Sequence, residues 1–180
     1  MTTANAAQLW QLLQQPDLRT YQDLPSAGLR AFQEMVGARP THLTARSAGR
    51  FEWMVQVGRP PRNAGWVSLR IAQHESYAAE IGYTILREYR GKGIATEAVR
   101  ALLAEAFEIA GLQRIRAFCV PENAASRNLL ERLNFQPDGV LPHGATVSGK
   151  PVDVLVHKLE RERWLQSGKT IEMSASAYPA

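Results

Sequence analysis

A basic, glycine-containing turn is the part of this chain whose residues are best suited to chemistry. Arg90-Gly91-Lys92-Gly93 follows a stretch rich in β-branched and aromatic residues and precedes an amphipathic helical pattern that begins at Ile94. Glycine lets the backbone approach a ligand closely because it carries no Cβ. The first N–H groups of the following helix, and the positive end of its dipole, point into the turn. The sequence therefore predicts an anion site built largely from backbone, of the kind that binds phosphate or diphosphate.

Two other glycine-containing phosphate loops require residues that this turn lacks. A Rossmann fingerprint needs a third glycine where Thr96 stands, and a Walker loop needs Ser or Thr directly after Lys92, where Gly93 stands. An ordinary strand-to-helix turn, in which glycine serves only the backbone conformation, is the remaining alternative.

The spacing Arg90-x-x-Gly93-x-Ala95 resembles the acetyl-coenzyme A signature of the GNAT N-acetyltransferases, Gln/Arg-x-x-Gly-x-Gly/Ala. The flanking Glu-Ile-Gly-Tyr and Gly-Ile-Ala-Thr-Glu-Ala are most similar to the RimJ/RimL branch of that family. The resemblance covers roughly residues 50–160 and is most specific over 80–135. It implies that acetyl-coenzyme A is the donor, that its diphosphate binds in this loop, and that no metal takes part.

A second motif, Asn123-Ala-Ala-Ser126, begins the segment that ends at Phe135 and resembles the family's Asn-x-x-(Ser/Ala) segment. In the family this helix lies beside the pantetheine arm of the cofactor. The resemblance implies that Asn123 binds that arm and that Ser126 is the acid for the departing thiolate. Asn123 is equally suited to cap the helix without any ligand. The tyrosine that is frequent on this helix is Leu130 here, and the usual glycine before the phenylalanine is Asn134.

The resemblance also implies a set of cofactor contacts along both motifs. The strand backbone from about Tyr83 to Arg87 would contact the pantetheine and the thioester, and one of its N–H groups could stabilise the oxyanion. The predicted cofactor-binding residues are Ile85, Leu86, Arg87, Arg90, Gly91, Lys92, Gly93, Ile94, Ala95, Thr96, Asn123 and Arg127.

Acetyl transfer to an amine needs a group that accepts the ammonium proton. We predict that Glu80, on the strand before the loop, fills this role, with a solvated surface charge as the alternative. The other candidates lie in predicted loops or turns, where a surface position explains them better: His74, Glu75, Asp138 and His143. The late acidic residue of RimL-like enzymes corresponds most closely to Ala145, so that role does not carry over. Cys119, in the middle of a predicted strand, is expected to be a buried, inert thiol.

Composition limits the class of protein. With 180 residues, 45% of them hydrophobic and 21% charged, the chain is long enough for one domain with a substantial core. A net charge of +4 suits an anionic ligand but is no nucleic-acid footprint by itself. The first seven residues lack the basic and apolar regions of a signal peptide, and a single cysteine gives no internal disulfide, so we expect a cytoplasmic protein.

Hydrophobic periodicity gives the order of the elements. Helices are predicted at 8–15, 26–36, 94–110 and 123–133, and strands at 51–57, 66–72, 79–86, 114–120, 136–142 and 152–159, the last two joined by a glycine-rich connection. The opening strand usual in the family is not evident in the first 45 residues. Residues 166–180 are small and polar and are expected to form a loose tail.

We therefore expect the α/β fold of the GNAT acyltransferases: a mixed, mostly antiparallel, splayed sheet with helices on both faces. A single domain would cover residues 1–165, with the first 50 or so on the acceptor side and a tail at 166–180. The expected function is acetyl transfer from acetyl-coenzyme A to a primary amine, on a protein N-terminus or a small molecule, by a monomer or homodimer. A non-catalytic acyl-coenzyme A sensor is the alternative, and a nucleic-acid-binding domain is a weaker one that rests on charge alone.

Overall fold

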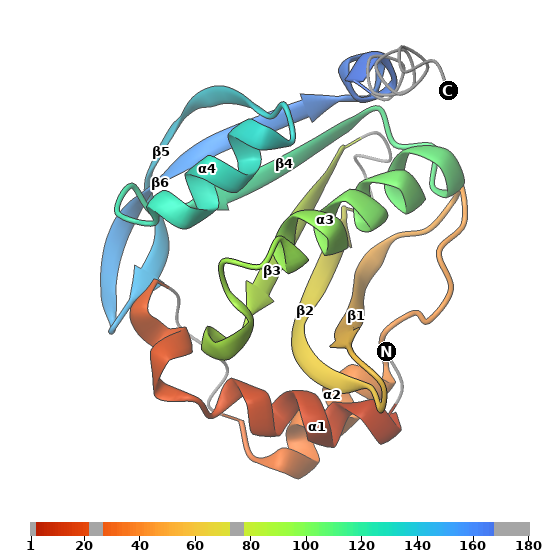
Figure 1. The fold of residues 1–180 in the computed structure, drawn as a ribbon, viewed down its shortest axis with the longest axis vertical. Helices are drawn as coiled ribbons and strands as arrows, with labels where there is room; N and C mark the ends of the chain where they lie inside the picture. Colours follow the sequence, from red (N-terminus) through yellow and green to blue (C-terminus); the bar gives the residue numbers. More distant parts are fainter. Residues whose placement is uncertain (1–2, 22–26, 73–77, 168–180) are drawn as a thin grey trace, which may run out of the picture.

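Six strands form one sheet in the computed structural model, which describes residues 3–21, 27–72 and 78–167 (Figure 1). Their order across the sheet is β1-β2-β3-β4-β6-β5, and every neighbouring pair is antiparallel except β3 and β4, which are parallel. The strands are β1 (Gly49–Val57), β2 (Arg62–Ile71), β3 (Ala78–Ile85), β4 (Arg114–Cys119), β5 (Gln136–Val147) and β6 (Lys150–Glu160).

The sheet opens between the parallel strands β3 and β4. Ala78–Ile81 of β3 pair with Arg114–Ala117 of β4, and the register between the two strands ends there. Beyond that point, Gly82–Ile85 continue alongside β2, while Phe118 and Cys119 continue alongside β6. The two strands therefore diverge toward their carboxyl ends, as the predicted splayed sheet requires.

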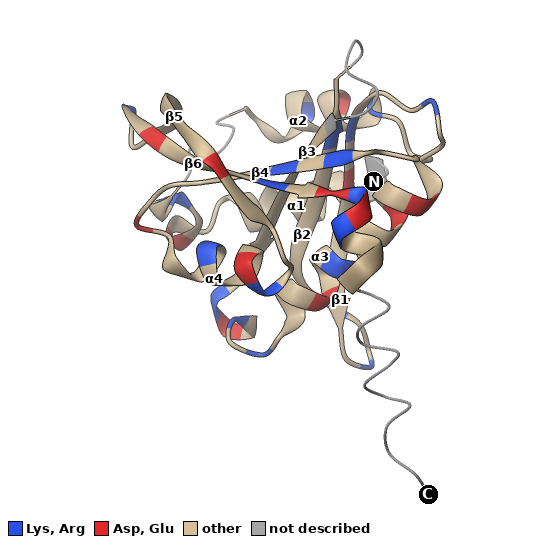
Figure 2. Ribbon diagram, turned by 90° about the horizontal axis from the view of Figure 1, so that it is seen from above, with Lys and Arg blue, Asp and Glu red and all other residues tan. Residues whose placement is uncertain are grey.

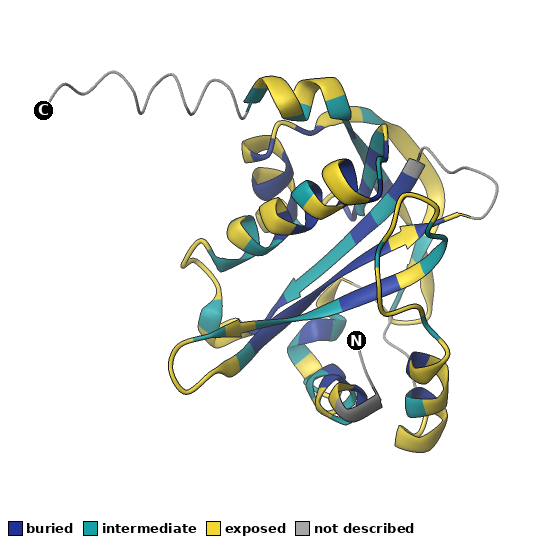
Figure 3. Cartoon of the chain, turned by 90° about the vertical axis from the view of Figure 1, so that its right-hand side faces the viewer, coloured by how far each residue is buried: buried dark blue, intermediate teal, exposed yellow. Residues whose placement is uncertain are grey.

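Helices cover both faces of this sheet. The view from above shows α2 (Leu29–Gly37) on one side and α3 (Ile94–Ala104) with α4 (Ala124–Arg132) on the other (Figure 2). The alternation of β2 explains this arrangement, because successive side chains point to opposite faces. Val67 and Leu69 pack in the main core with α3 and α4, whereas Trp66 packs in a second core with α1 (Thr3–Leu13) and α2. Buried segments accordingly run along the central strands, between the two layers of helices (Figure 3).

Short helical segments complete the fold. The 3₁₀ turn η1 (Pro16–Thr20) follows α1, and η2 (Arg87–Tyr89) follows β3. The chain from 161 to 167 is helical, which the periodicity did not predict, and Trp164 there stacks on Phe107 with ring centroids 6.0 Å apart. The described chain before Gly49 contains no strand, in keeping with the absence of an evident opening strand in the sequence.

Several predicted boundaries were wrong. The expected helix 94–110 is α-helical only to Ala104, and Glu105–Ile109 form a π-helical turn in which the Ala110 N–H bonds the Glu105 carbonyl at 3.1 Å. The first two helices lie at 3–13 and 29–37 rather than 8–15 and 26–36. β5 extends to Val147, so the expected glycine-rich connection is largely strand. Of the expected tail, residues 168–180 lie outside the described chain.

Candidate active site

β3 leads directly into the predicted anion loop. The buried Leu86 ends the strand, where its N–H bonds the Ala64 carbonyl at 2.8 Å. The loop then passes through η2 to Gly91 and Gly93, both left-handed, with φ of 75° and 79°. Gly93 is the N-cap of α3, and no side chain of the described residues caps that helix. The first N–H groups of α3 are therefore left to face the loop, as an anion site requires.

The two glycines are needed for backbone conformation rather than for lack of space. A Cβ added at Gly91 or Gly93 would meet no atom within 4 Å. Residues with a Cβ rarely adopt this φ, whereas glycine adopts it readily. The volume beside both positions is open, so the loop offers a backbone cradle with room for a ligand.

The cationic side chains of the loop are held by the protein itself. Arg90 donates from Nε to the Ile85 carbonyl at 2.9 Å and from Nη2 to Asp17 Oδ2 at 2.8 Å, which ties the loop to η1. Lys92 donates from Nζ to the Glu88 carbonyl at 2.9 Å. The side chains of Arg87 and Arg127 are exposed.

The second motif begins α4 across the opening from β3. Asn123 is the N-cap, and its Oδ1 accepts a hydrogen bond from the Ser126 N–H at 3.1 Å. The predicted capping role is therefore present in the structure. Ser126 is only 8% exposed, although it stands in the first turn of a surface helix.

Tyr83 is the partner that sequence reasoning missed. Its hydroxyl lies 2.6 Å from Ser126 Oγ, a short O–H···O distance that joins β3 to α4 across the splayed strands. The sequence pattern gave only the alternation of β3, which puts Tyr83 on the same face as Ile81. Nothing in the sequence indicates a partner 43 residues away.

Buried thiol and phenol groups surround Ser126. Burial raises the pKa of Tyr83 to about 12, against a weaker opposing effect of the Ser126 hydrogen bond. Burial also raises the pKa of the Cys119 thiol, opposed by a hydrogen bond from Ser126 and the charge of Arg127. Both groups are therefore neutral near neutral pH. Cys119 is buried, as predicted.

Glu80 lies on the opposite face of the sheet from Tyr83, because the two residues are an odd number of positions apart on one strand. Its carboxylate is half-exposed and lies 3.6 Å from Arg70 Nε. In register across the sheet, Arg50, Arg70, Glu80 and Arg116 form one row. Glu80 thus stands in a row of guanidinium groups. It lies in the first half of β3, where β3 is still paired with β4.

The remaining base candidates separate by their surroundings. The pKa of Asp138 is lowered by its hydrogen bond to Lys158, whose Nζ lies 2.7 Å from Oδ1, and by the charge of Arg116. Such a carboxylate is a weaker base than an unpaired one. His143 is exposed, and its backbone N–H donates to Asp153 Oδ1 at 2.9 Å. His74 and Glu75 lie outside the described residues.

One histidine that the pattern did not single out lies closer to the opening. His157 of β6 pairs with Ala117 of β4, and its Nδ1 is buried with no hydrogen-bond partner among the described residues. Burial lowers the pKa of His157, opposed by a hydrogen bond with the Leu155 backbone and reinforced by the charge of Arg127. Its imidazole is therefore neutral at pH 7.

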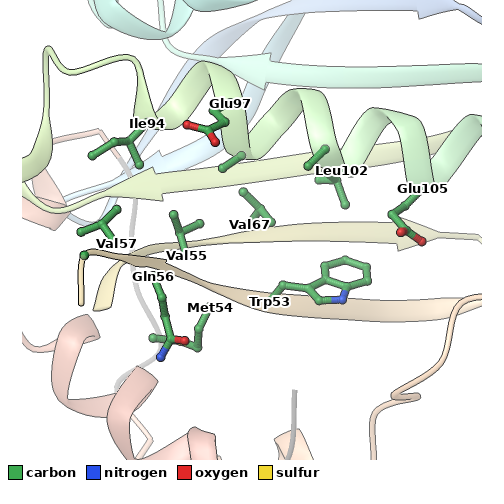
Figure 4. Close-up of a pocket in the computed structure, with 13 residues that line it drawn as sticks. Trp53, Met54, Val55, Gln56, Val57, Val67, Ile94, Glu97, Leu102 and Glu105 are labelled. Carbon is green, nitrogen blue, oxygen red and sulfur yellow. The ribbon is translucent and has the colours of Figure 1, made fainter. Parts of the chain in front are cut away.

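A separate groove of about 600 Å³ lies between β1 and α3 (Figure 4). It is distinct from the opening between β3 and β4. Its walls include Trp53, Val55, Val57 and Leu102, with Glu97 and Glu105 from α3. It shares only Ile94 with the predicted cofactor residues.

Among the described residues, no group of three or more His, Cys, Asp or Glu side chains could hold a metal ion. Within the same ranges, no helix has the length and apolar character to cross a membrane.

Known proteins resemble this chain in both sequence and structure. A family model described as "Acetyltransferase (GNAT) domain" matches residues 1–136. An uncharacterised N-acetyltransferase, p20 of Bacillus licheniformis, is 36% identical over 100 residues, or 56% of each chain. The spermidine N(1)-acetyltransferase of Escherichia coli K12 is 26% identical over 140 residues, which cover 78% of this chain and 73% of that protein.

The chain spans about half the length of two curated relatives that it matches at 36% identity, 55% of one and 56% of the other. Similarity in structure extends further. The ribosomal-protein-S5-alanine acetyltransferase of Vibrio fischeri matches with a TM-score of 0.76 over 91% of this chain and 92% of that one, at 21% identity. At that identity the likeness shows the fold alone.

Proposed function

Because the chain belongs to the GNAT family of N-acetyltransferases, in its RimJ/RimL-like branch, we propose that it acetylates the α-amine of a peptide or protein N-terminus. The observation that carries the proposal is the divergence of β3 from β4 after Ile81, directly before a backbone anion loop. A thioester placed in that opening is within reach of both faces of the sheet.

The donor implied by the family is acetyl-coenzyme A, and the loop residues fit it. The left-handed Gly91 and Gly93 leave open volume beside the uncapped start of α3, where the diphosphate would bind. Ile85, Leu86 and Arg87 would line the pantetheine path on the β3 side. Asn123 and Arg127 would line it on the α4 side.

In the proposed chemistry, the two faces of the sheet carry different steps. The acceptor amine approaches from the Glu80 face, and Glu80 takes its proton directly or through water. The nitrogen attacks the thioester carbonyl, and a backbone N–H of β3 stabilises the oxyanion. The C–S bond then breaks with its electron pair on sulfur, to which Ser126 donates a hydrogen bond from the other face, and the amide nitrogen loses its second proton to water.

The charges around Glu80 favour a peptide α-amine over a polyamine. Arg70 and Arg116 flank Glu80 in the strand register, so an acceptor with several positive charges would be repelled there. An α-amine has an ordinary pKa of about 7.7–8.0, against about 10.4 for a lysine-like amine, so a larger fraction is already deprotonated near pH 7. A single, less basic amine therefore suits this row of side chains better.

The experiment is thiol release from acetyl-coenzyme A against free-N-terminus peptides, polyamines, amino acids and aminoglycosides. Release with peptides above all other acceptors supports the proposal, and release only with polyamines would contradict the choice of acceptor. Binding of coenzyme A without turnover on any acceptor would favour the acyl-coenzyme A sensor. We also propose that the protein acts in the cytoplasm as a monomer or homodimer, which chromatography with light scattering would test for the assembly.

A further inference from the structure

We propose that Tyr83 is a positioning residue for Ser126, whose proton it directs toward the departing sulfur. This inference rests on the proposed function, because it requires a thiolate that leaves between β3 and α4. It concerns a side chain from the strand, whereas the sequence motif points to residues of the helix.

Ser126 is fixed from two directions. Asn123 accepts a hydrogen bond from its backbone N–H at 3.1 Å, and its hydroxyl lies 2.6 Å from the hydroxyl of Tyr83. Its side chain is buried, so water does not compete freely for these bonds. The serine hydroxyl therefore has few alternative orientations.

The direction of the hydroxyl pair follows from acidity. Each hydroxyl has one proton to donate and can accept as well. A phenol is a stronger hydrogen-bond donor than an aliphatic alcohol, so Tyr83 donates and Ser126 Oγ accepts. Ser126 then keeps its own proton for a third atom: in this structure it hydrogen-bonds the Cys119 thiol, and the coenzyme A sulfur would take that place. Burial keeps the phenol in its neutral, donating form at every working pH.

The position of Tyr83 puts this device at the opening of the sheet. Ile81 is the last residue of β3 that pairs with β4, and Tyr83 is two residues further along the same face. Cys119, at the end of β4, adjoins the same serine. A sulfur atom that leaves in the gap between the two strands would meet Ser126 rather than bulk solvent.

The test compares Tyr83→Phe, Ser126→Ala and the double variant, all in a Cys119→Ala background that removes the protein's own thiol. Tyr21→Phe, which deletes an exposed phenol, is the matched control. Two quantities are measured: kcat with acetyl-coenzyme A, and the pKa of the coenzyme A thiol in its complex with the protein, followed by thiolate absorbance. The thiol pKa does not depend on the acceptor.

We expect Tyr83→Phe to lower kcat about 10-fold, with little change in coenzyme A affinity, and to raise the pKa of the bound thiol. Ser126→Ala should do the same at least as strongly, and the double variant should be no worse than Ser126→Ala, because residues that act as a unit are not additive. Tyr21→Phe should leave both quantities unchanged.

Additive losses in the double variant, or an unchanged thiol pKa beside a loss of thermal stability, would overturn the inference and leave Tyr83 a structural tie between β3 and α4. If Tyr83→Phe does not fold, the pKa of the bound thiol in Ser126→Ala decides. An unchanged pKa there would show that Ser126 does not act on the sulfur, so Tyr83 would have no catalytic group to position. A wild type that binds coenzyme A but acetylates no amine would overturn the proposed function together with this inference. An active wild type with unaffected variants would overturn this inference alone.

Discussion

Gly93 is the residue on which the cofactor loop most depends. We predict that Gly93→Val weakens coenzyme A binding by about 10-fold or more, measured by titration calorimetry. The left-handed conformation costs a residue with a Cβ about 1–2 kcal/mol, and each 1.4 kcal/mol is a factor of ten in affinity. The added side chain would also occupy the open volume in which a diphosphate would lie.

Gly58 supplies the matched control for this prediction. It has φ of 80° in the connection between β1 and β2, outside the Arg90–Gly93 turn. Gly58→Val should therefore lower stability through the same backbone strain and leave coenzyme A affinity as in the wild type. Equal affinity in both variants would contradict the assignment of the loop.

Glu80 can be tested through the pH dependence of turnover. Glu80→Gln should lower kcat/KM about 100-fold at low pH and much less at high pH, because an amine that is already deprotonated needs no base. Arg70→Gln removes the ion partner of Glu80 but keeps its carboxylate, so its pH profile should keep the shape of the wild-type profile. The same profile shape in Glu80→Gln and wild type would leave Glu80 a surface charge.

For single residues, the sequence predicted the features that depend on residues nearby in the chain. The glycine loop and the Asn123 cap are set by residues within a few positions, and both are present. The bond of Tyr83 to Ser126 and the burial of His157 depend on how strands and helices are brought together. No local pattern carries that information.

Among the elements, the contact between β2 and β3 leaves the least room for change. A Cβ on Gly65 would lie 2.0 Å from the Thr84 carbonyl oxygen, a backbone atom that cannot rotate away. We predict that Gly65→Ala destabilises the fold by about 1–3 kcal/mol, as overpacked positions do. For a chain of this size that lowers Tm by roughly 2–12 °C, which a thermal melt would measure.

Gly28→Ala provides the comparison for the same change of side chain. Gly28 is the N-cap of α2, with φ of −61°, and a Cβ there meets no atom within 4 Å. Its Tm should stay within a few degrees of the wild-type value. If Gly65→Ala and Gly28→Ala had the same Tm, β3 would be able to move away from β2. That result would contradict the prediction that β3 is held rigidly against β2.

The elements themselves were predicted well where one periodicity dominates. β4 alternates between buried and partly buried residues along its length, and the start of α3 follows the glycine turn. β5 was the main failure, because glycines that appear to end a strand in the sequence belong to irregularities within it. Gly139 and Gly144 lie in the two register shifts of β5 against β6, between Pro137 and Val140 and between Leu141 and Ala145.

For the molecule as a whole, the resemblance anticipated the splayed sheet and the helices on its two faces. It gave little for the first 45 residues, where α1 and α2 pack through Leu9, Phe32 and Val36 onto Trp66. Short helices of this kind take their positions from the sheet that they cover rather than from their own sequence.

The partly buried imidazole of His157 makes the stability of the whole molecule depend on pH. Burial lowers its pKa in the folded state, so between the ordinary value near 6.5 and that lowered value only the unfolded chain takes up the proton. The free energy of unfolding should therefore decrease as pH falls from 6.5, and urea denaturation at pH 7.5, 6.5 and 5.5 would measure the decrease. His157→Gln should reduce this dependence, because it removes the imidazole whose pKa the fold lowers. If His157→Gln keeps the full dependence on pH, another group takes up the proton on unfolding. The pKa of His157 would then be the same in the folded and unfolded chain, against the lowering that burial and the charge of Arg127 produce.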